Sequence, residues 1–210
     1  MRLFDYWRSS AAYRVRIALR LKGVAFEQVP VNLRLGAQRT LDYLAHNQQG
    51  LVPALEAEGT TLTQSLAIVE WLEETRPDPP LLPPDAASRA MVRSLALHVA
   101  CEIHPINNLR VLQFLQQRLG LDEEDVKSWY RHWVDEGFAS LERRLGATAG
   151  TYCFGDTVGI ADLCLVPQVY NARRFSCDLS PYPLISRIDA ACLRLPAFAD
   201  ARPERQPDAA

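Results

Sequence analysis

Lysine, cysteine and long apolar runs are all scarce in this sequence. Only 2 of its 23 Lys and Arg residues are lysine, and 25 Asp and Glu residues bring the formal net charge to −2. This near-neutral balance argues against nucleic acid or an anionic membrane as the main partner, because both attract strongly basic surfaces. No apolar run approaches the roughly 18 residues that cross a bilayer, so we predict no membrane segment.

The few cysteines form no motif. The chain has 5, an odd number, widely spaced and without a CxxC pair. That spacing favours reduced, buried thiols over a disulfide framework or a structural zinc site. The 4 histidines are scattered without a carboxylate cluster, which predicts no metal site. The N-terminus is rich in arginine but has no long apolar segment, so we interpret it as the start of the fold and expect a cytoplasmic protein.

The overall composition is that of a folded protein. Hydrophobic residues make up 48% and charged residues 23% of the chain, ordinary values that exclude global disorder. A length of 210 residues suits one large or two small domains and leaves room for a core.

The first 75 residues alternate between strand and helix patterns. Pro30 would confine the second strand to a sheet edge, because proline has no N–H to donate to a neighbouring strand. Apolar residues at 66, 68, 69 and 72 form the stripe of an amphipathic helix. In order, we expect a strand at 3–7, a helix at 11–22, a strand at 26–32, a helix near 37–45, a hairpin at 51–63 that turns at Glu58-Gly59, and a helix from Ser65.

A domain boundary is predicted at 76–85, where five prolines in ten residues exclude any regular element. Beyond it no segment has a strand pattern. Gly159 is a weak helix cap, but Asp162 can accept a hydrogen bond from its N–H, so we expect the helix there to form. The predicted helices lie at 86–119 with an interruption at Pro105, at 123–145, at 160–172 and at 184–193. The fold class is α/β followed by all-α, with domains at 1–80 and 86–210.

The turn Arg8-Ser9-Ser10 lies between the first strand and the first helix. A hydroxyl there lies beside free backbone N–H groups and the positive end of the helix dipole, which together stabilise an anion and lower the pKa of a nearby thiol. Ser9 or Ser10 can equally be a simple N-cap.

Two further points in the α/β domain favour anionic or peptide ligands. A cis bond at Val52-Pro53 would leave the Val52 N–H and C=O free to pair with a peptide, although a simple edge proline is the alternative. Ser65 can cap the following helix while Gln64 and the helix N-terminus hold a carboxylate, and capping alone is again the alternative. Together the three points describe a site for a short, carboxylated peptide that carries a thiol.

The sequence resembles the zeta class of glutathione transferases over nearly its whole length. The resemblance rests on the segments RSSAAYRVRIAL, LVPALE, QSLAIVEWLEE, TAGTYCFGD, IADLCLVPQVYNARRF and the final RQPD. It implies a thioredoxin-like N-terminal domain, a helical C-terminal domain and a homodimer. It also implies glutathione as cofactor and a small dicarboxylate as substrate.

Carried over by position, the resemblance implies that Ser9 activates glutathione. It also implies a substrate contact for Arg174, because the family has a substrate-binding arginine at that position. Arg8, which precedes the turn at Ser9, and Arg110, which follows HPINN, are our further candidates for the substrate carboxylates. Each of the three can instead form a surface ion pair. His104 would hydrogen-bond to glutathione, or be structural. The implied glutathione-binding residues are Ser9, Ser10, Ala11, Gln38, Val52, Pro53, Gln64, Ser65, His104, Asn108, Leu109 and Arg110, and the implied catalytic residues are Ser9, Ser10, Arg8 and Arg174.

The chain departs from the animal members of the class at Ala11, where they have cysteine. Because glutathione brings its own thiol, the core chemistry does not need that cysteine, whereas side activities tuned by the cysteine do. The expected reaction is cis–trans isomerisation of maleylacetoacetate. Addition of a thiolate turns the conjugated double bond into a single bond that can rotate before the thiol leaves.

Three other functions remain open. Maleylpyruvate isomerisation uses the same chemistry on a smaller diacid, and the segment HPINN and Ala11 are compatible with it. Glutathione conjugation or dehalogenation of α-halo acids would use the same thiolate. A glutathione-binding protein without catalysis is the fourth reading, and an intact Ser9, Gln64-Ser65 and Arg174 argue against it.

Overall fold

The computed structural model describes residues 1–209, and the chain divides into two compact units. The first unit comprises residues 1–81 together with the chain from Arg194 onward, and the second comprises residues 82–193. The segment after Arg194, which the sequence analysis assigned to the helical domain, thus packs with the first unit.

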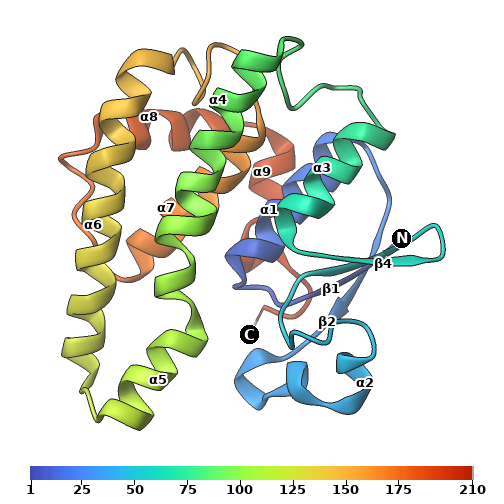
Figure 1. The fold of residues 1–210 in the computed structure, drawn as a ribbon, viewed down its shortest axis with the longest axis vertical. Helices are drawn as coiled ribbons and strands as arrows, with labels where there is room; N and C mark the ends of the chain where they lie inside the picture. The colour runs from blue at the N-terminus through green and yellow to red at the C-terminus, as the bar shows by residue number, and fades with distance from the viewer. Residues whose placement is uncertain (210) are drawn as a thin grey trace. The chain divides into compact units, whose positions relative to one another are not determined.

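The first unit is built on a four-stranded sheet with the order β2-β1-β3-β4 (Figure 1). Strand β1 (Arg2–Asp5) pairs in parallel with β2 (Glu27–Pro30) and antiparallel with β3 (Ala54–Ala57), and β3 pairs with β4 (Thr60–Thr63). As predicted, the strand that ends at Pro30 lies at a sheet edge, and the hairpin turns at Glu58 and Gly59, both of positive φ.

Helices cover the two faces of this sheet. Helix α1 (Ser10–Leu21) packs on α3 (Ser65–Thr75) on one face, while α2 (Leu41–Leu44) lies on the other (Figure 1). Before α2 the chain forms two 3₁₀ turns, η1 (Leu33–Leu35) and η2 (Ala37–Arg39). The helical residues predicted near 37–45 are therefore divided between η2 and α2, because Thr40 is extended and its hydroxyl accepts the Tyr43 N–H to cap α2.

The remaining elements of the first unit come from the end of the chain. Helix α9 (Pro196–Asp200), which the sequence did not predict, packs on α1, and the 3₁₀ turn η5 (Pro203–Arg205) follows it. Beyond η5, Gln206 is 4% exposed and hydrogen-bonds to Gln28 and to the carbonyls of Asp200 and Arg202, which fixes this part of the chain on the first unit.

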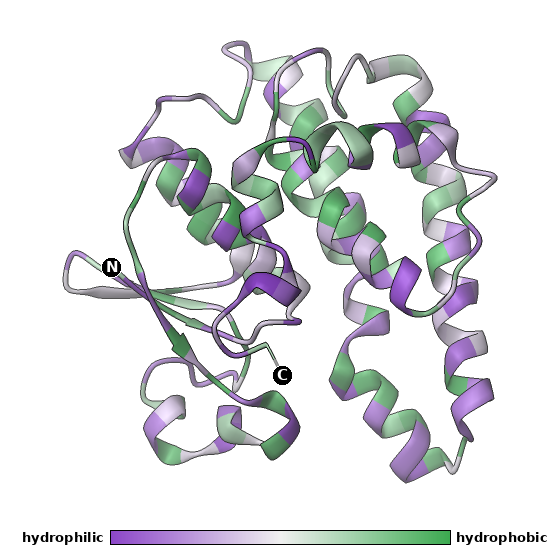
Figure 2. Ribbon diagram, turned by 180° about the vertical axis from the view of Figure 1, so that it is seen from behind, coloured by the Kyte–Doolittle hydropathy of each residue, from purple (hydrophilic) through white to green (hydrophobic). Residues whose placement is uncertain are grey.

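The second unit is helical, and its described residues contain one isolated bridge, Ala149 to Gly155, and no strand. Helix α7 (Ile160–Arg174) supplies its centre, with twelve buried residues. Hydrophobic and hydrophilic residues alternate along α6 (Glu123–Thr148), whose buried positions recur every three or four residues (Figure 2). Its elements are α4 (Ala86–Leu97), η3 (His98–Ile103), η4 (Pro105–Asn107), α5 (Leu109–Leu119), α6 (Glu123–Thr148), α7 (Ile160–Arg174) and α8 (Pro183–Cys192).

The break in the long predicted helix at 86–119 begins before Pro105. Residues His98–Ile103 form a π-helix, η3, that packs on α6 at Gly137. A Cβ at Gly137 would lie only 2.4 Å from Cγ1 of Ile103, so this approach requires glycine. The His98 ring also lies 3.0 Å from the Gly137 carbonyl oxygen, which fixes the same contact.

Candidate functional site

Ser9 is the N-cap of α1. Its Oγ accepts the Ala12 N–H at 3.2 Å, and its own N–H donates to the Tyr6 carbonyl at 2.8 Å. A hydroxyl that accepts one hydrogen bond still has its proton to donate, so capping does not prevent Ser9 from stabilising an anion. The first turn of α1 has no acidic residue, so no carboxylate there offsets the positive end of the helix dipole.

Arg8 precedes this cap and is half-buried. Its guanidinium lies 4.8 Å from the centre of the Trp7 ring, and Nη2 donates to the Tyr6 hydroxyl at 3.4 Å. Within residues 1–209 the Arg8 guanidinium forms no ion pair with a carboxylate. The surface ion pair that the sequence left open for Arg8 is therefore absent from these residues. A cation held by an aromatic ring keeps its charge available to an anionic ligand.

The Val52-Pro53 peptide bond is cis, as proposed from the sequence. Val52 is buried, and within the described residues neither its N–H nor its C=O has a hydrogen-bond partner. The preceding carbonyl, of Leu51, accepts from the Tyr43 hydroxyl and from Asn47 Nδ2. Burial raises the pKa of Tyr43, which keeps the phenol protonated as the donor. The loop is thus fixed while the Val52 backbone remains available to a ligand.

Helix α3 begins differently from the prediction, which made Ser65 the cap. Gln64 occupies the N-cap position with a positive φ of 71°, and no side chain caps the helix. The prediction failed because the Gln64 amide donates instead to Gln49 Oε1 at 2.7 Å, while the Ser65 hydroxyl is turned inward. A positive φ at a non-glycine residue is strained and is common at ligand sites. The first N–H groups of α3 thus have no side-chain partner and are available to a carboxylate.

A buried arginine lies behind this helix start. Arg14 is 2% exposed, and its Nη1 donates to Ser65 Oγ at 3.3 Å. Its Nε and Nη2 have no hydrogen-bond partner within the described residues. Arg14 is not among the site residues predicted from the sequence. The signal was the segment RVRIAL, which places Arg14 and Arg16 in an otherwise apolar helix, where a charged side chain needs a specific reason.

The last candidate in this unit is Gln38, in η2. Its side-chain oxygen is buried without a partner, and its backbone oxygen lies against Gly50, where a Cβ would approach it to 3.1 Å. One apolar cluster connects the η2 segment with the loop at Val52 and with the turn before Ser9. That cluster consists of Phe4, Tyr6, Val31, Tyr43, Val52 and Ala54, with Trp7, Val29, Leu33 and Ala37 packed against it.

The other candidates lie in the helical unit. His104 follows the π-helix η3 and is half-buried, and π-helical turns are frequent at functional sites. Asn108 caps α5 by accepting the Arg110 N–H at 3.2 Å. Leu109 is 40% exposed and Arg110 is exposed, so both side chains lie on the surface of this unit.

Arg174 ends α7 and is exposed. Its guanidinium lies 4.9 Å from the centre of the Phe175 ring, which stacks on Tyr130 at 3.6 Å. Burial raises the pKa of Tyr130, so its hydroxyl remains protonated beneath this stack. The neighbouring Arg173 instead pairs with buried Asp189 at 2.6 Å, so the two consecutive arginines have different surroundings.

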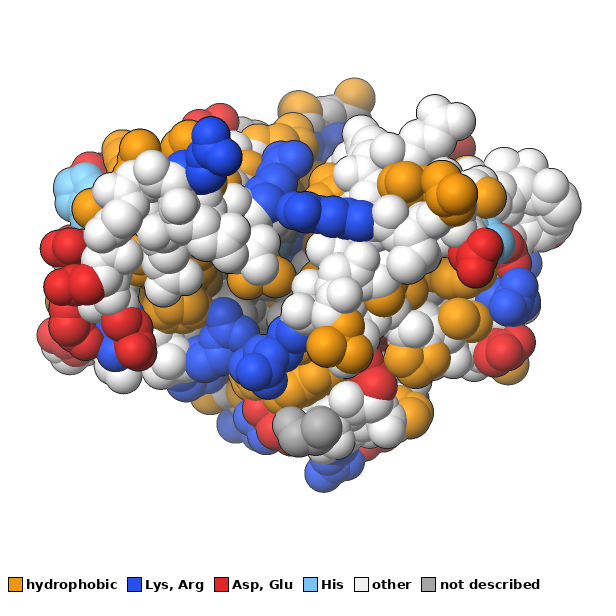
Figure 3. Space-filling view, turned by 90° about the horizontal axis from the view of Figure 1, so that it is seen from below, with side chains coloured by type: hydrophobic (Ala, Val, Ile, Leu, Met, Phe, Trp, Pro, Cys, Tyr) orange, Lys and Arg blue, Asp and Glu red, His pale blue; other side chains and the backbone are white. Residues whose placement is uncertain are grey.

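One cavity within the helical unit has the wrong charge for an acidic substrate. It measures about 590 Å³, and four carboxylates outnumber Arg131 and His132 in its wall. Figure 3 shows acidic side chains gathered where α6 begins, the end of the helix that contributes two of these carboxylates. Such a surface repels dicarboxylates. The described residues contain no His, Cys, Asp or Glu group that fits a metal ion, and none of their helices is long and apolar enough to cross a membrane.

Known proteins have a similar fold and a related sequence. The glutathione S-transferase N-terminal domain family matches residues 1–74. A probable maleylacetoacetate isomerase from Vibrio cholerae is 51% identical over 209 residues, 99% of this chain and 97% of that protein. A holo maleyl pyruvate isomerase, described as a bacterial zeta-class glutathione S-transferase, superposes over 100% of both chains with 49% identity and a TM-score of 0.98.

A second solved structure contains bound ligands. A maleylacetoacetate isomerase from Methylobacterium extorquens, with bound malonate and glutathione, is 46% identical over 100% of both chains, with a TM-score of 0.96. The thioredoxin-like sheet with following helices is therefore that of a glutathione transferase, and the predicted fold class is confirmed. The chain belongs to the zeta class of the glutathione transferase family.

Proposed function

We propose that this chain is a glutathione-dependent isomerase that converts 4-maleylacetoacetate to 4-fumarylacetoacetate in phenylalanine and tyrosine breakdown. Relatives of that name align over their full length with about half of their residues identical. The observation that carries the proposal is that α1 and α3 both begin without an acidic residue, on either side of the unpaired Val52 backbone in the sequence. The free N–H groups at the two helix starts, together with the N–H and C=O of Val52, are the groups that a thiol-bearing, carboxylated peptide requires.

Glutathione fits the residues of the first unit. Its γ-glutamyl carboxylate would be held by the N–H groups at the start of α3, by Gln64 and Ser65, and by the positive charge of Arg14. The N–H and C=O of Val52, before Pro53, would pair with the cysteinyl backbone. The buried, unpartnered oxygen of Gln38 suits a donor at the glycyl end of the tripeptide. This set of donors and acceptors is complementary to a tripeptide with two carboxylates.

When bound, glutathione supplies a thiolate that adds to the conjugated double bond and leaves again after rotation about the resulting single bond. The chain raises the fraction of thiolate at neutral pH, because the Ser9 hydroxyl and the N-terminus of α1 favour the negative charge. Ser10 and Ala11 complete this turn. No protein residue needs to accept a proton permanently, so the site requires no general base of its own.

Arginines are the proposed partners of the substrate carboxylates. Arg8, Arg110 and Arg174 each carry a planar guanidinium that can bind a carboxylate with two hydrogen bonds. Each also stabilises the negative charge that develops on the ketone oxygen during addition. His104, Asn108 and Leu109 complete the proposed set of residues from the helical unit.

Maleylpyruvate isomerisation is the second candidate function. The holo structure with a TM-score of 0.98 has that name, and the chain has Ala11 where animal members of the class have cysteine. Both reactions use the same thiolate addition, so the difference lies in the length of the diacid. A conjugating or dehalogenating transferase would also use the thiolate but would consume glutathione.

Absorbance of maleylacetoacetate and of maleylpyruvate, followed with and without glutathione, separates these functions. The proposal predicts turnover of maleylacetoacetate only with glutathione, at constant total thiol. Ser9→Ala should lower kcat at neutral pH about ten-fold or more, and Ser128→Ala, on the exposed face of α6, should leave it unchanged. Turnover of maleylpyruvate alone would assign the chain to the second function. Falling thiol would indicate conjugation, and binding without turnover would contradict both isomerases.

The proposal also includes an oligomeric state and a cellular location. We expect a homodimer, so the particle in solution should have about twice the mass of the 23.6 kDa chain, measured by light scattering. A particle of the single-chain mass would contradict it. A cytoplasmic location is consistent with the five cysteines, all of which are free thiols, three of them buried.

A further inference from the structure

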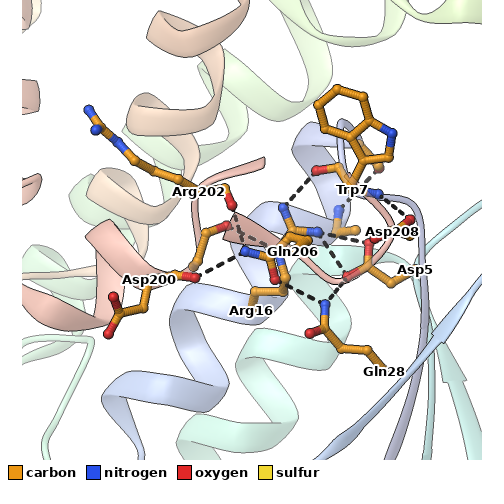
Figure 4. Close-up of polar contacts among 11 residues, drawn as sticks. Asp5, Trp7, Arg16, Gln28, Asp200, Arg202, Gln206 and Asp208 are labelled. Carbon is orange, nitrogen blue, oxygen red and sulfur yellow. Dashed lines mark hydrogen bonds and ion pairs between the residues drawn. The ribbon is translucent and has the colours of Figure 1, made fainter. Parts of the chain in front are cut away.

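Residues 200–208, which we call the C-terminal segment, fix the backbone just before Ser9. The Trp7 N–H donates to a carboxylate oxygen of Asp208 at 3.0 Å, and the Trp7 carbonyl accepts from Arg16 Nη2 at 2.9 Å (Figure 4). The two polar backbone groups of Trp7 are therefore both held by side chains, one from α1 and one from the end of the chain.

Trp7 lies inside the turn that places Ser9. The Ser9 N–H donates to the Tyr6 carbonyl at 2.8 Å, so residues Tyr6 to Ser9 form a four-residue turn with Trp7 second. Ser9 then caps α1 through the Ala12 N–H. Because the turn is short and closed by these two bonds, a shift of the Trp7 peptide would move the Ser9 hydroxyl.

Gln206 anchors the segment that carries Asp208. Its amide nitrogen donates to the carbonyls of Asp200 and Arg202, and its amide oxygen accepts from Gln28 at 3.0 Å. Gln206 is 4% exposed, so its side chain has little contact with water. Gln28 also donates to Asp5 at 3.1 Å, which connects the segment to strand β1.

Arg16 joins both ends of this network. It is fully buried, with Nη1 2.8 Å from each carboxylate oxygen of Asp5 and Nε donating to the Ala201 carbonyl at 3.1 Å. Its third nitrogen is the one that holds Trp7. A guanidinium presents its donors in a rigid plane, so one side chain sets the strand, the turn and the C-terminal segment at fixed positions relative to each other (Figure 4).

From this arrangement we propose that Asp208 is a positioning residue for the catalytic turn, acting through the Trp7 peptide to place Ser9 for glutathione. This role rests on the proposed function of Ser9. Asp208 touches no reacting group itself, and it is half-buried near the end of the chain, so the fold should tolerate its substitution. Asp208 thus belongs to the site, although it is 201 positions away from Trp7 in the sequence.

The test compares Asp208→Ala, which removes the acceptor, with Asp208→Asn, which keeps an acceptor oxygen. Hydrogen exchange of the Ser9 amide in the protein without glutathione should rise about ten-fold in Asp208→Ala and stay within about two-fold of wild type in Asp208→Asn. The Leu55 amide in β3 should not change in either variant. The dissociation constant for glutathione should rise about ten-fold in Asp208→Ala alone. Glu74→Gln, an exposed carboxylate on α3, is the matched control.

Three results would overturn the proposal. One is unchanged Ser9 exchange and glutathione affinity in Asp208→Ala. Another is a rise in Leu55 exchange equal to that of Ser9, which would make the segment a support for global stability only. The third is an equal effect of Ala and Asn at 208. If the wild-type protein binds no glutathione, the proposed function fails, and the Ser9 exchange comparison still decides whether Asp208 positions the turn.

Discussion

Most α-helices of the helical unit begin at a carboxylate, whereas the two long helices of the first unit, α1 and α3, do not. In the helical unit, carboxylates of the chain itself close four of them: Asp85 at α4, Asp122 at α6, Asp162 at α7 and Glu142, which accepts two N–H groups of α8. In the first unit, α1 and α3 have no acidic residue in their first turns. The carboxylates that would stabilise those two ends are the ones that a bound peptide brings.

The helical unit has one exception, and it is informative. Helix α5 is capped by the neutral Asn108 and has no acidic residue in its first turn. This is one of the segments that the family resemblance connects with glutathione. An uncharged helix start is therefore a feature that candidate sites in both units share, whereas carboxylates close the other four α-helices of the helical unit.

The largest effect is expected where a structural cap is removed. The Asp162 carboxylate is buried and accepts the N–H groups of Gly159 and Cys153 at 2.8 and 2.9 Å. Asp162→Ala leaves both donors unsatisfied and should lower the free energy of unfolding by about 3 kcal/mol, measured by denaturant unfolding. Asp162→Asn, which keeps one acceptor, should lose less. A loss below about 1 kcal/mol in Asp162→Ala would show that this cap is not structural.

An intermediate effect is expected when α3 receives a carboxylate of its own. Ala67 is exposed in the first turn of α3, where Glu favours the helix. The Ala67→Glu variant should therefore fold normally. Its dissociation constant for glutathione should nevertheless rise about ten-fold, because the new carboxylate occupies the place of the γ-glutamyl carboxylate and repels it. Isothermal titration measures this change, with Ala67→Gln as the neutral control. Equal affinities for the two variants would contradict the assignment of α3.

The smallest effect concerns an exposed cap. The Ser88 N–H, donating to Asp85, holds the pKa of that carboxyl below its ordinary value near 3.8. A depressed pKa means that the ionised cap stabilises the fold above that range and that the stabilisation is lost as the pH falls through it. Asp85→Asn should lower Tm slightly at neutral pH, and the difference should vanish in acid. A difference that persists in strong acid would show that charge is not its cause.

The sequence predicted the elements whose signals are local. Proline at position 30 placed a strand at the sheet edge, the helix patterns gave α1, α3, α6 and α7, and the Gly159 to Asp162 bond formed as expected. The anion-favouring turns were also local features. The cap of α3 was wrong by one residue because Gln64 adopts a positive φ that no local propensity favours.

The contacts that join distant segments could not be predicted. Nothing near Arg16 in the sequence indicates that it binds Asp5 and the Ala201 carbonyl, and nothing near Asp208 indicates Trp7. The π-helix at 98–103 likewise depends on Gly137 in another helix. In each case the energy comes from a tertiary contact, so the residue's neighbours in sequence carry no signal.

The most direct test is to measure the pKa of the glutathione thiol when bound, because we infer that the N-terminus of α1, which has no acidic residue, lowers this pKa. Its thiolate absorbance can be titrated on the wild type, on Ala11→Asp, which adds a carboxylate to the first turn of α1, and on its neutral partner Ala11→Asn. We predict a thiol pKa below the roughly 8.5 of a free thiol in the wild type and Ala11→Asn, and about one unit higher in Ala11→Asp. The same pKa in all three proteins would contradict the view that the N-terminus of α1 activates the cofactor.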